Sequence, residues 1–277
     1  MGILRIISVN SSVPLPDAPT FGQTATGWQE LLPARTGDPP GVCADAGRLG
    51  GRWVAAASIA GMVHRHRGAS RQDAYAAVWD GDVLGLAVAD GLGSASHGGV
   101  GAAVASLEAA SQLARGAHLH DAIGAADQAV RAAADGARSE PLQYATTLVA
   151  ASVQAGDDDL MEVHAASVGD SSALVLGGGH FARLFADDDE GPVNVTPGAL
   201  PSGSPTPATI VSLTLLPGAT LVLCTDGLDL DLRLSPALRH WIGERLEAPA
   251  SVLELLWTLS YRRRGSFDDR TALVVWP

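Results

Sequence analysis

Apolar runs bounded by glycine and polar residues dominate the middle of the chain and predict strands. Residues 53–61 (WVAAASIAG) form one such run. Residues 75–91 indicate a hairpin, because Asp80-Gly81 is a favoured two-residue connection between strands. The second strand of this hairpin, VLGLAVA (83–89), is apolar at nearly every position, which predicts burial on both of its faces.

A glycine-rich turn, GLGSASHGG, then precedes two helical stretches at residues 100–117 and 118–138. Strands return between residues 145 and 185, and again over residues 208–227. The remaining elements expected are two helices and a final strand, at residues 236–246, 251–264 and 271–276. Strands and helices therefore come in groups rather than alternating. This order predicts an α+β fold of antiparallel sheets with paired helices.

The first fifty residues differ from the rest. They are rich in Pro and Gly with little periodicity, so residues 1–50 are expected to form an irregular arm and residues 51–277 the folded domain. Residues 186–208 are polar and Pro-rich, which predicts a flap or a long loop. Apolar residues make up 47% of the chain but aromatic residues only 5%. The core must therefore be built from Ala, Val and Leu.

Charge excludes several functions. The chain has 30 acidic and 18 basic residues, and every basic residue is Arg. Without Lys there is no Walker A, kinase-type or Schiff-base lysine. The net charge of −12 argues against nucleic-acid binding, which needs a basic surface.

Targeting signals and cysteine chemistry are also missing from the sequence. Cys43 and Cys224 stand far apart, so neither a zinc site nor a disulfide framework is expected. No signal peptide, lipidation pattern or apolar run of about 18 residues is present. A cytoplasmic protein without a membrane partner is therefore expected.

Four Asp-Gly dipeptides suggest where the chemistry lies. Asp80 lies in the hairpin turn and Asp135 near a helix end, which are structural positions. Asp90-Gly91 and Asp226-Gly227 instead follow the apolar strands LGLAVA and TLVLCT. A carboxylate at the end of a core strand is costly unless it is paired or binds a metal.

Two further aspartates stand at strand ends, Asp73 before the first hairpin strand and Asp268 before the last strand. At a separation of about 4 Å and an effective dielectric constant near 20, each like-charged pair would cost roughly 4 kcal/mol. Two divalent cations such as Mg²⁺ or Mn²⁺ would cancel four carboxylates. Sites of this type lower the pKa of a bound water, which can then attack a phosphate ester.

Short strings in the sequence carry a family resemblance. They are QDA (72–74), VADGLGS (88–94), ATTL (145–148), SVGDSSALV (167–175), CTDGL (224–228) and DDRT (268–271). Their order resembles that of the metal-dependent protein phosphatases of the PPM, or type 2C, family, in its bacterial branch. The resemblance covers residues 53–277. It implies a four-layer α-β-β-α sandwich of two antiparallel sheets flanked by helix pairs, with a binuclear Mn²⁺ or Mg²⁺ centre.

The resemblance also implies roles for residues. Asp90 looks like the carboxylate that bridges both metal ions, with Asp226 and Asp268 on the first ion. The side chain of Asp73 and the carbonyl of Gly91 match the remaining ligands, on the second ion. Asp90, Asp226 and Asp268 are accordingly the expected catalytic set.

Two more aspartates match places in the family pattern. Asp170, in VGDSS, matches an aspartate associated with a third metal ion, although it also reads as an ordinary turn residue. Asp269 stands where the family often has Asn. The implied reaction is attack on phosphoserine or phosphothreonine by water bridging two metal ions. The implied partners are a phosphoprotein substrate and its Ser/Thr kinase, with the phosphatase acting as a monomer.

The sequence departs from the family pattern near the substrate phosphate. Many members have Arg at the place of Gly68, and Asn at the place of Arg71. The segment preceding Asp73 instead offers Arg65 and Arg67, which would share one face of a strand. Either of them is expected to bind the phosphate, because a guanidinium clamps two phosphate oxygens; the alternative is a solvated basic strand end.

Histidines near these residues leave alternatives open. His64 and His66 would share the other face of that strand and form a possible metal pair, although the spacing is weak support for one. Leu92 stands where eukaryotic members have a His that protonates the leaving group. His97 lies close in sequence, but nothing in the pattern assigns it that role.

Three other functions compete with that of a metal-dependent protein phosphatase. GLGSAS lacks the last Gly of a dinucleotide-binding fingerprint, and no βαβ unit follows it. A PPM-type fold that binds phosphoproteins with weak or no catalysis would account for the missing Arg at Gly68. A phosphatase of small phosphate esters is the other alternative.

Overall fold

The computed structural model describes residues 30–32, 41–156, 160–185, 198–202 and 208–277. The strands are β1 Glu30–Leu32, β2 Val42–Leu49, β3 Arg52–Ile59, β4 Asp73–Asp80, β5 Val83–Asp90, β6 Leu148–Ala155, β7 Met161–Val168, β8 Ser172–Gly177, β9 His180–Arg183, β10 Thr209–Leu215, β11 Thr220–Cys224 and β12 Arg270–Val275. The α-helices are α1 Met62–Arg67, α2 Gly98–Ala114, α3 Leu119–Gly136, α4 Asp226–Leu234, α5 Pro236–Leu246 and α6 Val252–Leu259, and a short 3-10 helix spans Pro141–Tyr144.

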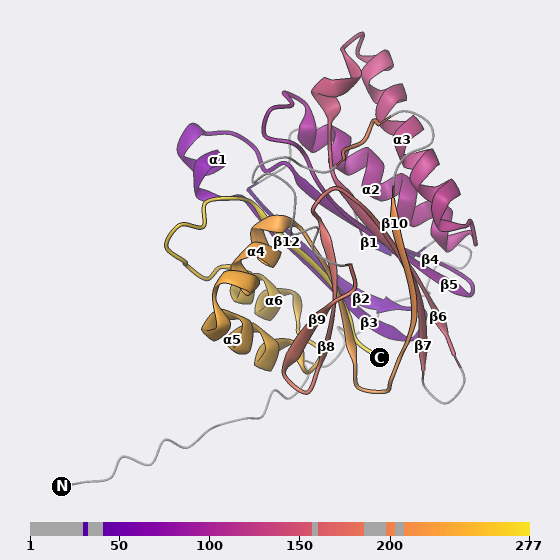
Figure 1. Ribbon diagram of the computed structural model, residues 1–277, viewed down its shortest axis with the longest axis vertical. Coiled ribbons are helices and arrows are strands. Elements are labelled where there is room, and N and C mark those ends of the chain that lie inside the picture. The colour runs from indigo at the N-terminus through magenta and orange to yellow at the C-terminus, as the bar shows by residue number, and fades with distance from the viewer. Residues whose placement is uncertain (1–29, 33–40, 157–159, 186–197, 203–207) are drawn as a thin grey trace, which may run out of the picture.

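The strands form two antiparallel six-stranded sheets. Sheet A has the order β1-β4-β5-β6-β7-β10, and sheet B the order β2-β3-β12-β11-β8-β9. Helices α2 and α3 cover sheet A, and α4, α5 and α6 cover sheet B (Figure 1). The predicted four-layer α-β-β-α sandwich is therefore confirmed. No helix in the described part of the chain is long and apolar enough to cross a membrane.

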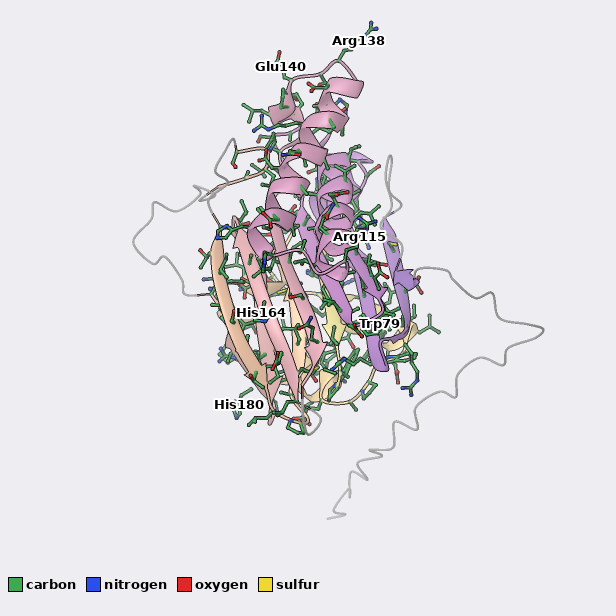
Figure 2. The ribbon with its side chains drawn as sticks, turned by 90° about the vertical axis from the view of Figure 1, so that its right-hand side faces the viewer. Trp79, Arg115, Arg138, Glu140, His164 and His180 are labelled. Carbon is green, nitrogen blue, oxygen red and sulfur yellow. The ribbon has the colours of Figure 1, made fainter. Side chains whose placement is uncertain are left out.

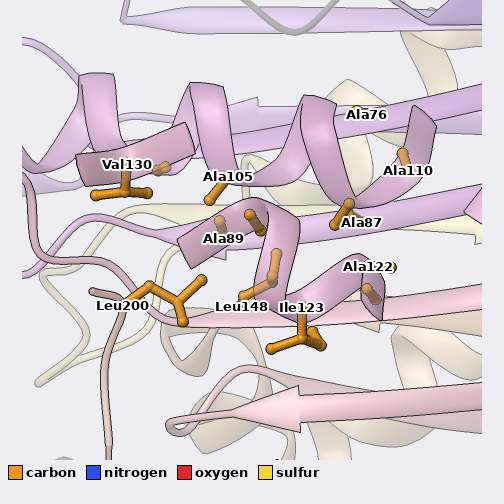
Figure 3. Packing of buried hydrophobic residues seen from close by; sticks show 14 of the residues in the cluster. Ala76, Ala87, Ala89, Ala105, Ala110, Ala122, Ile123, Val130, Leu148 and Leu200 are labelled. Atoms are coloured by element: carbon orange, nitrogen blue, oxygen red, sulfur yellow. The ribbon is translucent and has the colours of Figure 1, made fainter. Parts of the chain in front are cut away.

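Three apolar clusters hold the layers together. One lies between the sheets and includes Leu84, Leu86 and Val149, while the other two lie between each sheet and its helices. Small side chains line the contact of α2 and α3 with sheet A, as Figure 3 shows for Ala87, Ala105 and others. The low aromatic content thus has the expected consequence, a core of Ala, Val and Leu.

Close packing of α2 on sheet A depends on a glycine in β5. A Cβ atom on Gly85 would lie 2.0 Å from the carbonyl oxygen of Ala110, so any side chain there would push the helix off the sheet. The two helices leave part of sheet A uncovered, and His164 of β7 lies exposed there (Figure 2). Arg138 and Glu140 lie at the far tip of the helical layer (Figure 2).

Several elements differ from the sequence prediction. Val42–Leu49 forms β2 and pairs along its length with β3, so the irregular arm predicted for residues 1–50 does not include these residues. The segment Met62–Arg67, expected as a strand, is a helix. Asp226 starts a helix, α4, that the pattern did not predict. In the hairpin, Asp80 pairs with Val83, so the two connecting residues are Gly81 and Asp82.

Candidate metal centre

Antiparallel pairing brings the first two predicted aspartates together. Asp73 is the first residue of β4 and Asp90 the last residue of β5, and the two are direct partners in the register of the hairpin. Opposed residues in neighbouring strands have Cβ atoms about 5 Å apart. Two carboxyl groups are therefore held side by side at the open end of the hairpin.

The other two predicted aspartates lie at the ends of strands in sheet B. Asp226 lies two residues after β11, and Asp268 lies two residues before β12, which is the neighbour of β11 in the sheet. A hydrogen bond from the amide of Thr225 to the carbonyl of Thr271 (3.2 Å) joins the two strand ends. Asp226 also occupies the first turn of α4, where a negative charge interacts favourably with the helix dipole.

Two threonines connect the sheets at this point. The hydroxyl groups of Thr225, which directly follows β11, and Thr271, in β12, donate to Oδ2 of Asp73 in sheet A at 2.9 and 2.6 Å. Asp73 is 2% exposed. Among the described residues, its other carboxylate oxygen, Oδ1, is buried without a hydrogen-bond partner, and the same holds for Oδ1 of Asp226. The sequence strings CTDGL and DDRT contained both threonines, but nothing in the pattern indicated that they bind Asp73.

Burial and mutual repulsion raise the pKa values of these carboxyl groups. Desolvation and the charge of Asp269 raise the pKa of Asp73 to about 8. Desolvation, followed by the charges of Asp73, Asp226 and Asp268, raises the pKa of Asp90 well above its usual range. Four carboxyl groups from two sheets therefore act as one electrostatic cluster.

The pKa values of Asp226 and Asp268, the two residues that the resemblance assigns to the first ion, are also raised. Desolvation, Asp170 and Asp268 raise the pKa of Asp226 to about 6. The pKa of Asp268 is raised by partial desolvation and by Asp269, even though its side chain is the exposed one of the four. The cluster thus runs from a buried floor at Asp73 to a solvent-facing rim at Asp268.

The donor set fits a hard divalent cation. The cluster offers carboxylate oxygens, two of which are buried and lack hydrogen-bond partners. In the described residues, however, no three Asp, Glu, His or Cys side chains already converge as ligands that could hold a metal ion. A bound divalent cation would offset the repulsion among these carboxylates.

Asp170 lies at the edge of the cluster. It follows Gly169 in the turn between β7 and β8, and its charge acts on Asp226. Desolvation raises its pKa, Asp268 adds to this, and the guanidinium of Arg233 opposes it. Arg233 is half-exposed in the last turn of α4 and forms an ion pair with Asp229 at 3.4 Å. The sequence reading did not single out Arg233, because α4 was not predicted.

The two predicted phosphate-binding arginines lie on helix α1 rather than on a strand. Arg65 and Arg67 are exposed there, and on a helix residues two apart do not share a face. The prediction of a common face is therefore wrong. Gly68 ends the helix in the left-handed conformation, with φ 64°. Arg71, by contrast, is 2% exposed and donates to Ser58 Oγ at 2.7 Å and to the carbonyl of Asp73.

Asp269 fixes this helix against the cluster. Its Oδ1 accepts hydrogen bonds from the amide of Gly61 (2.6 Å) and from Nδ1 of His64 (2.8 Å), and its Oδ2 accepts one from the amide of Gln72 (2.7 Å). One carboxylate thus binds residues on both sides of α1. His64 and His66 lie two residues apart on a helix and do not share a face, so the structure does not support a metal pair of the two.

Glycines allow the segment that carries Asp268 to lie between neighbouring elements. A Cβ atom on Gly61 would lie 2.3 Å from the carbonyl carbon of Asp268, and one on Gly227 would lie 2.0 Å from the carbonyl oxygen of Asp269. The glycines therefore permit a backbone approach that any side chain would prevent.

Other candidates are placed less favourably or lie outside the described residues. His97 is exposed at the start of α2, with its ring centroid 5.0 Å from that of Tyr144. Most of the predicted flap at 186–208 and the acidic runs 157–159 and 187–189 lie outside the described residues. Gly198–Ser202 is described, and there Leu200 exchanges backbone hydrogen bonds with Thr146.

Two antiparallel sheets packed between helical layers, with aspartates at neighbouring strand ends, define the class of α-β-β-α sandwich proteins. Residues 60–253 match the family model described as protein phosphatase 2C. The chain belongs to the protein phosphatase 2C family. No curated protein matches it.

Solved structures share the fold at low sequence identity. PppA, a regulatory component of the T6SS in Pseudomonas aeruginosa, is 22% identical with a TM-score of 0.57, over 84% of this chain and 99% of that one. The catalytic domain of the phosphatase PstP, solved with two manganese ions, is 22% identical (TM-score 0.59; 81% and 98% covered). Stp1 of Staphylococcus aureus is 14% identical (TM-score 0.58; 89% and 99% covered). At these identities the likeness establishes the fold alone.

Proposed function

We propose that this protein is a metal-dependent phosphatase that hydrolyses phosphoserine and phosphothreonine in proteins. The observation that carries the proposal is the meeting of Asp73, Asp90, Asp226 and Asp268, from both sheets, at one place where burial and neighbouring carboxylates raise the pKa of each. Such repulsion costs free energy that bound divalent cations would recover.

The cluster would hold two Mn²⁺ or Mg²⁺ ions. Asp90 would contribute to both, Asp226 and Asp268 to one, and Asp73 with the carbonyl of Gly91 to the other. When bound, the ions supply positive charge toward phosphate oxygens and lower the pKa of bound water. The PstP neighbour, solved with two manganese ions, supports this assignment. Asp170, whose charge acts on Asp226, would serve a third ion.

The remaining residues of the site position these groups. Thr225 and Thr271 hold Oδ2 of Asp73, so that its Oδ1 is left for a cation. Asp269 holds α1 next to the segment that carries Asp268, and Arg65 and Arg67 are exposed on this helix. We assign these two arginines to the phosphate group, because the chain has no Lys and a guanidinium binds two phosphate oxygens.

The cysteines support direct transfer of the phosphoryl group to water. Cys224 is fully buried, and desolvation raises the pKa of its thiol well above the usual range, so it is not a thiolate nucleophile. Cys43 lies 3.3 Å from the hydroxyl of Tyr75 in a hydrogen bond. No covalent phosphoenzyme on cysteine is therefore part of the proposal.

The test is hydrolysis of a phosphothreonine peptide with and without Mn²⁺. Asp90→Asn or Asp226→Asn is expected to lower kcat/KM by more than about a hundredfold. Removing even a residue that only hydrogen-bonds to a metal ligand lowers metal affinity or activity about ten- to a hundredfold. Asp135→Asn is the matched control, because Asp135 belongs to an exposed Asp-Gly dipeptide far from the cluster.

Two outcomes would replace the proposal. Phosphopeptide binding without turnover at any Mn²⁺ concentration would indicate a binding module, the function suggested by Gly68 in place of the usual Arg. Turnover of small aryl phosphates with no activity on any phosphopeptide would indicate a phosphatase of small esters. In either case the Asp90→Asn variant separates metal-dependent behaviour from a contaminating activity.

A further inference from the structure

A cationic surface lies next to the aspartate cluster. It is formed by helix α1 and by the loop between α6 and β12, and we call it the basic lip. Its four exposed arginines are Arg65, Arg67, Arg262 and Arg264. Three large apolar side chains accompany them, Met62 at 64% exposed, Phe267 at 51% and Val63 at 39%.

The two segments form one surface. The amide of Val63 in α1 donates to the carbonyl of Phe267 in the loop at 3.2 Å. The amide of Gly61 and the imidazole of His64 bind Asp269, two residues beyond Phe267. Figure 1 shows α1 beside the loop that leads into β12, at one end of the molecule. The basic lip is therefore fixed to the same segment that carries Asp268.

The arginines of the lip differ from the others near the site. Arg183, Arg233 and Arg263 form ion pairs with carboxylates of α4. Within the part of the chain that the structure describes, no ion pair joins the four lip arginines to a carboxylate. The chain as a whole carries a net charge of −12. A local group of four solvated guanidinium groups in so acidic a protein is complementary to an acidic partner.

We propose that the basic lip binds an acidic segment of the phosphoprotein substrate, with an apolar residue of that segment against Met62 and Phe267. The proposal rests on the proposed function and adds a substrate class to it. Charged groups around a site steer oppositely charged partners and select among them. The lip is rigidly joined to Asp268, so a docked segment would present its phosphorylated residue to the cluster.

An anionic membrane surface is the other partner that such chemistry could attract. The size of the lip disfavours it, because α1 has six residues and helices that lie in a membrane interface need a larger apolar face. A peptide needs only a few charge pairs and one apolar contact. The two partners are separated by the experiment below.

The experiment compares two phosphothreonine peptides with the full-length protein and Mn²⁺. One peptide carries Asp and Glu and one Leu around the phosphothreonine, and in the other Gln replaces the acids. The acidic peptide is expected to show the higher kcat/KM. R262E/R264E is expected to lower kcat/KM for the acidic peptide by about tenfold and to leave the Gln peptide and an aryl phosphate unchanged.

The matched control is R115E/R138E, which reverses two exposed arginines on the opposite helical layer (Figure 2). It changes the net charge by the same amount and is expected to leave the preference for the acidic peptide in place. Equal kcat/KM for both peptides, or equal losses in the two double variants, would overturn the proposal. Binding to vesicles of anionic lipid that R262E/R264E abolishes, without peptide preference, would also overturn it.

Failure of the proposed function gives a different result. If the wild-type protein hydrolyses neither the peptides nor the aryl phosphate, the chemistry is wrong, and fluorescence anisotropy of the two labelled peptides tests the lip by itself. Tighter binding of the acidic peptide that R262E/R264E abolishes then supports the lip. Equal affinities refute it.

Discussion

Helix α4 connects two groups of carboxylates that lie close in sequence and differ in how they are satisfied. Asp231 is 2% exposed and accepts hydrogen bonds from the hydroxyl of Tyr261 (2.7 Å), from Nη1 of Arg263 (2.8 Å) and from Oγ of Ser266 (2.5 Å). Nε of Arg270 lies 3.5 Å away. Two cations and two hydroxyl groups therefore surround one buried carboxylate.

Asp226, five residues earlier, belongs to the opposite case. Desolvation and the charges of Asp170 and Asp268 raise its pKa to about 6, and its Oδ1 has no hydrogen-bond partner within the part of the chain that the structure describes. The comparison shows that burial of an aspartate does not by itself mark a functional site. A satisfied carboxylate such as Asp231 holds the loop before β12 in place, whereas the unsatisfied cluster stores repulsion that a ligand can relieve.

The largest expected effect breaks the satisfied group. Asp231→Ala is expected to lower the free energy of unfolding by about 3–5 kcal/mol, because it leaves two partly buried guanidinium groups and the buried hydroxyl of Ser266 without their partner. Urea unfolding measures the change, with the exposed Asp135→Ala as control. A loss below about 1 kcal/mol would mean that the Asp231 network is worth no more than a surface ion pair, and the comparison would fail.

The next effect concerns the unsatisfied group and its pH dependence. The folded-state pKa of Asp73 is raised from 3.8 to about 8, so between these values the folded state binds more protons than the unfolded state. Stability then falls as pH rises. Without metal, in EDTA, Tm is expected to drop by more than about 4 °C between pH 5 and pH 8, the shift that about 1 kcal/mol produces in a domain of this size.

Two further measurements sharpen this pH result. Asp73→Asn is expected to remove much of the drop in Tm, because the amide carries no charge to bury. Saturating Mn²⁺ at pH 8 is expected to raise Tm, since a ligand that binds only the folded state stabilises it. A Tm in EDTA that rises steadily from pH 5 to pH 8 would show that the cluster is not repulsive.

The smallest expected effect distinguishes the arginines at the rim. Arg65→Gln or Arg67→Gln is expected to raise KM for a phosphopeptide about fivefold with little change in kcat, as for a solvent-exposed charge contact. Arg233→Gln is the informative comparison, because Arg233 acts on Asp170 from the other side of the cluster. If Arg233→Gln raises KM more than Arg65→Gln or Arg67→Gln does, the phosphate binds next to α4 rather than next to α1.

The sequence predicted the sheets and the aspartates well for a physical reason. Residues 83–89 of β5 and all residues of β11 are buried, so each forms an unbroken apolar run, and the end of that run marks where the chain leaves the core. Asp90 and Asp226 stand there. The pairing of Asp73 with Asp90 also follows from a hairpin, once its turn is located near Asp80.

The prediction failed where an element depends on distant partners. Six residues are too few for a stable isolated helix, so nothing local indicates that Met62–Arg67 is α1. The helix exists because Gly68 ends it and Asp269, some two hundred residues away, binds both of its flanks. Strand β2 has no clear alternation and is defined by its pairing with β3.

By itself, the sequence determined the family, the layered fold, the alanine-rich core and the four strand-end aspartates, because apolar periodicity and short motifs are local signals. Tertiary structure alone decided the partners of those aspartates. Thr225 and Thr271 reach Asp73 across the two sheets, Asp231 gathers its arginines from the loop before β12, and Asp269 fixes α1. Such contacts join residues far apart in the chain, and only the packing of the two sheets brings them within hydrogen-bonding distance.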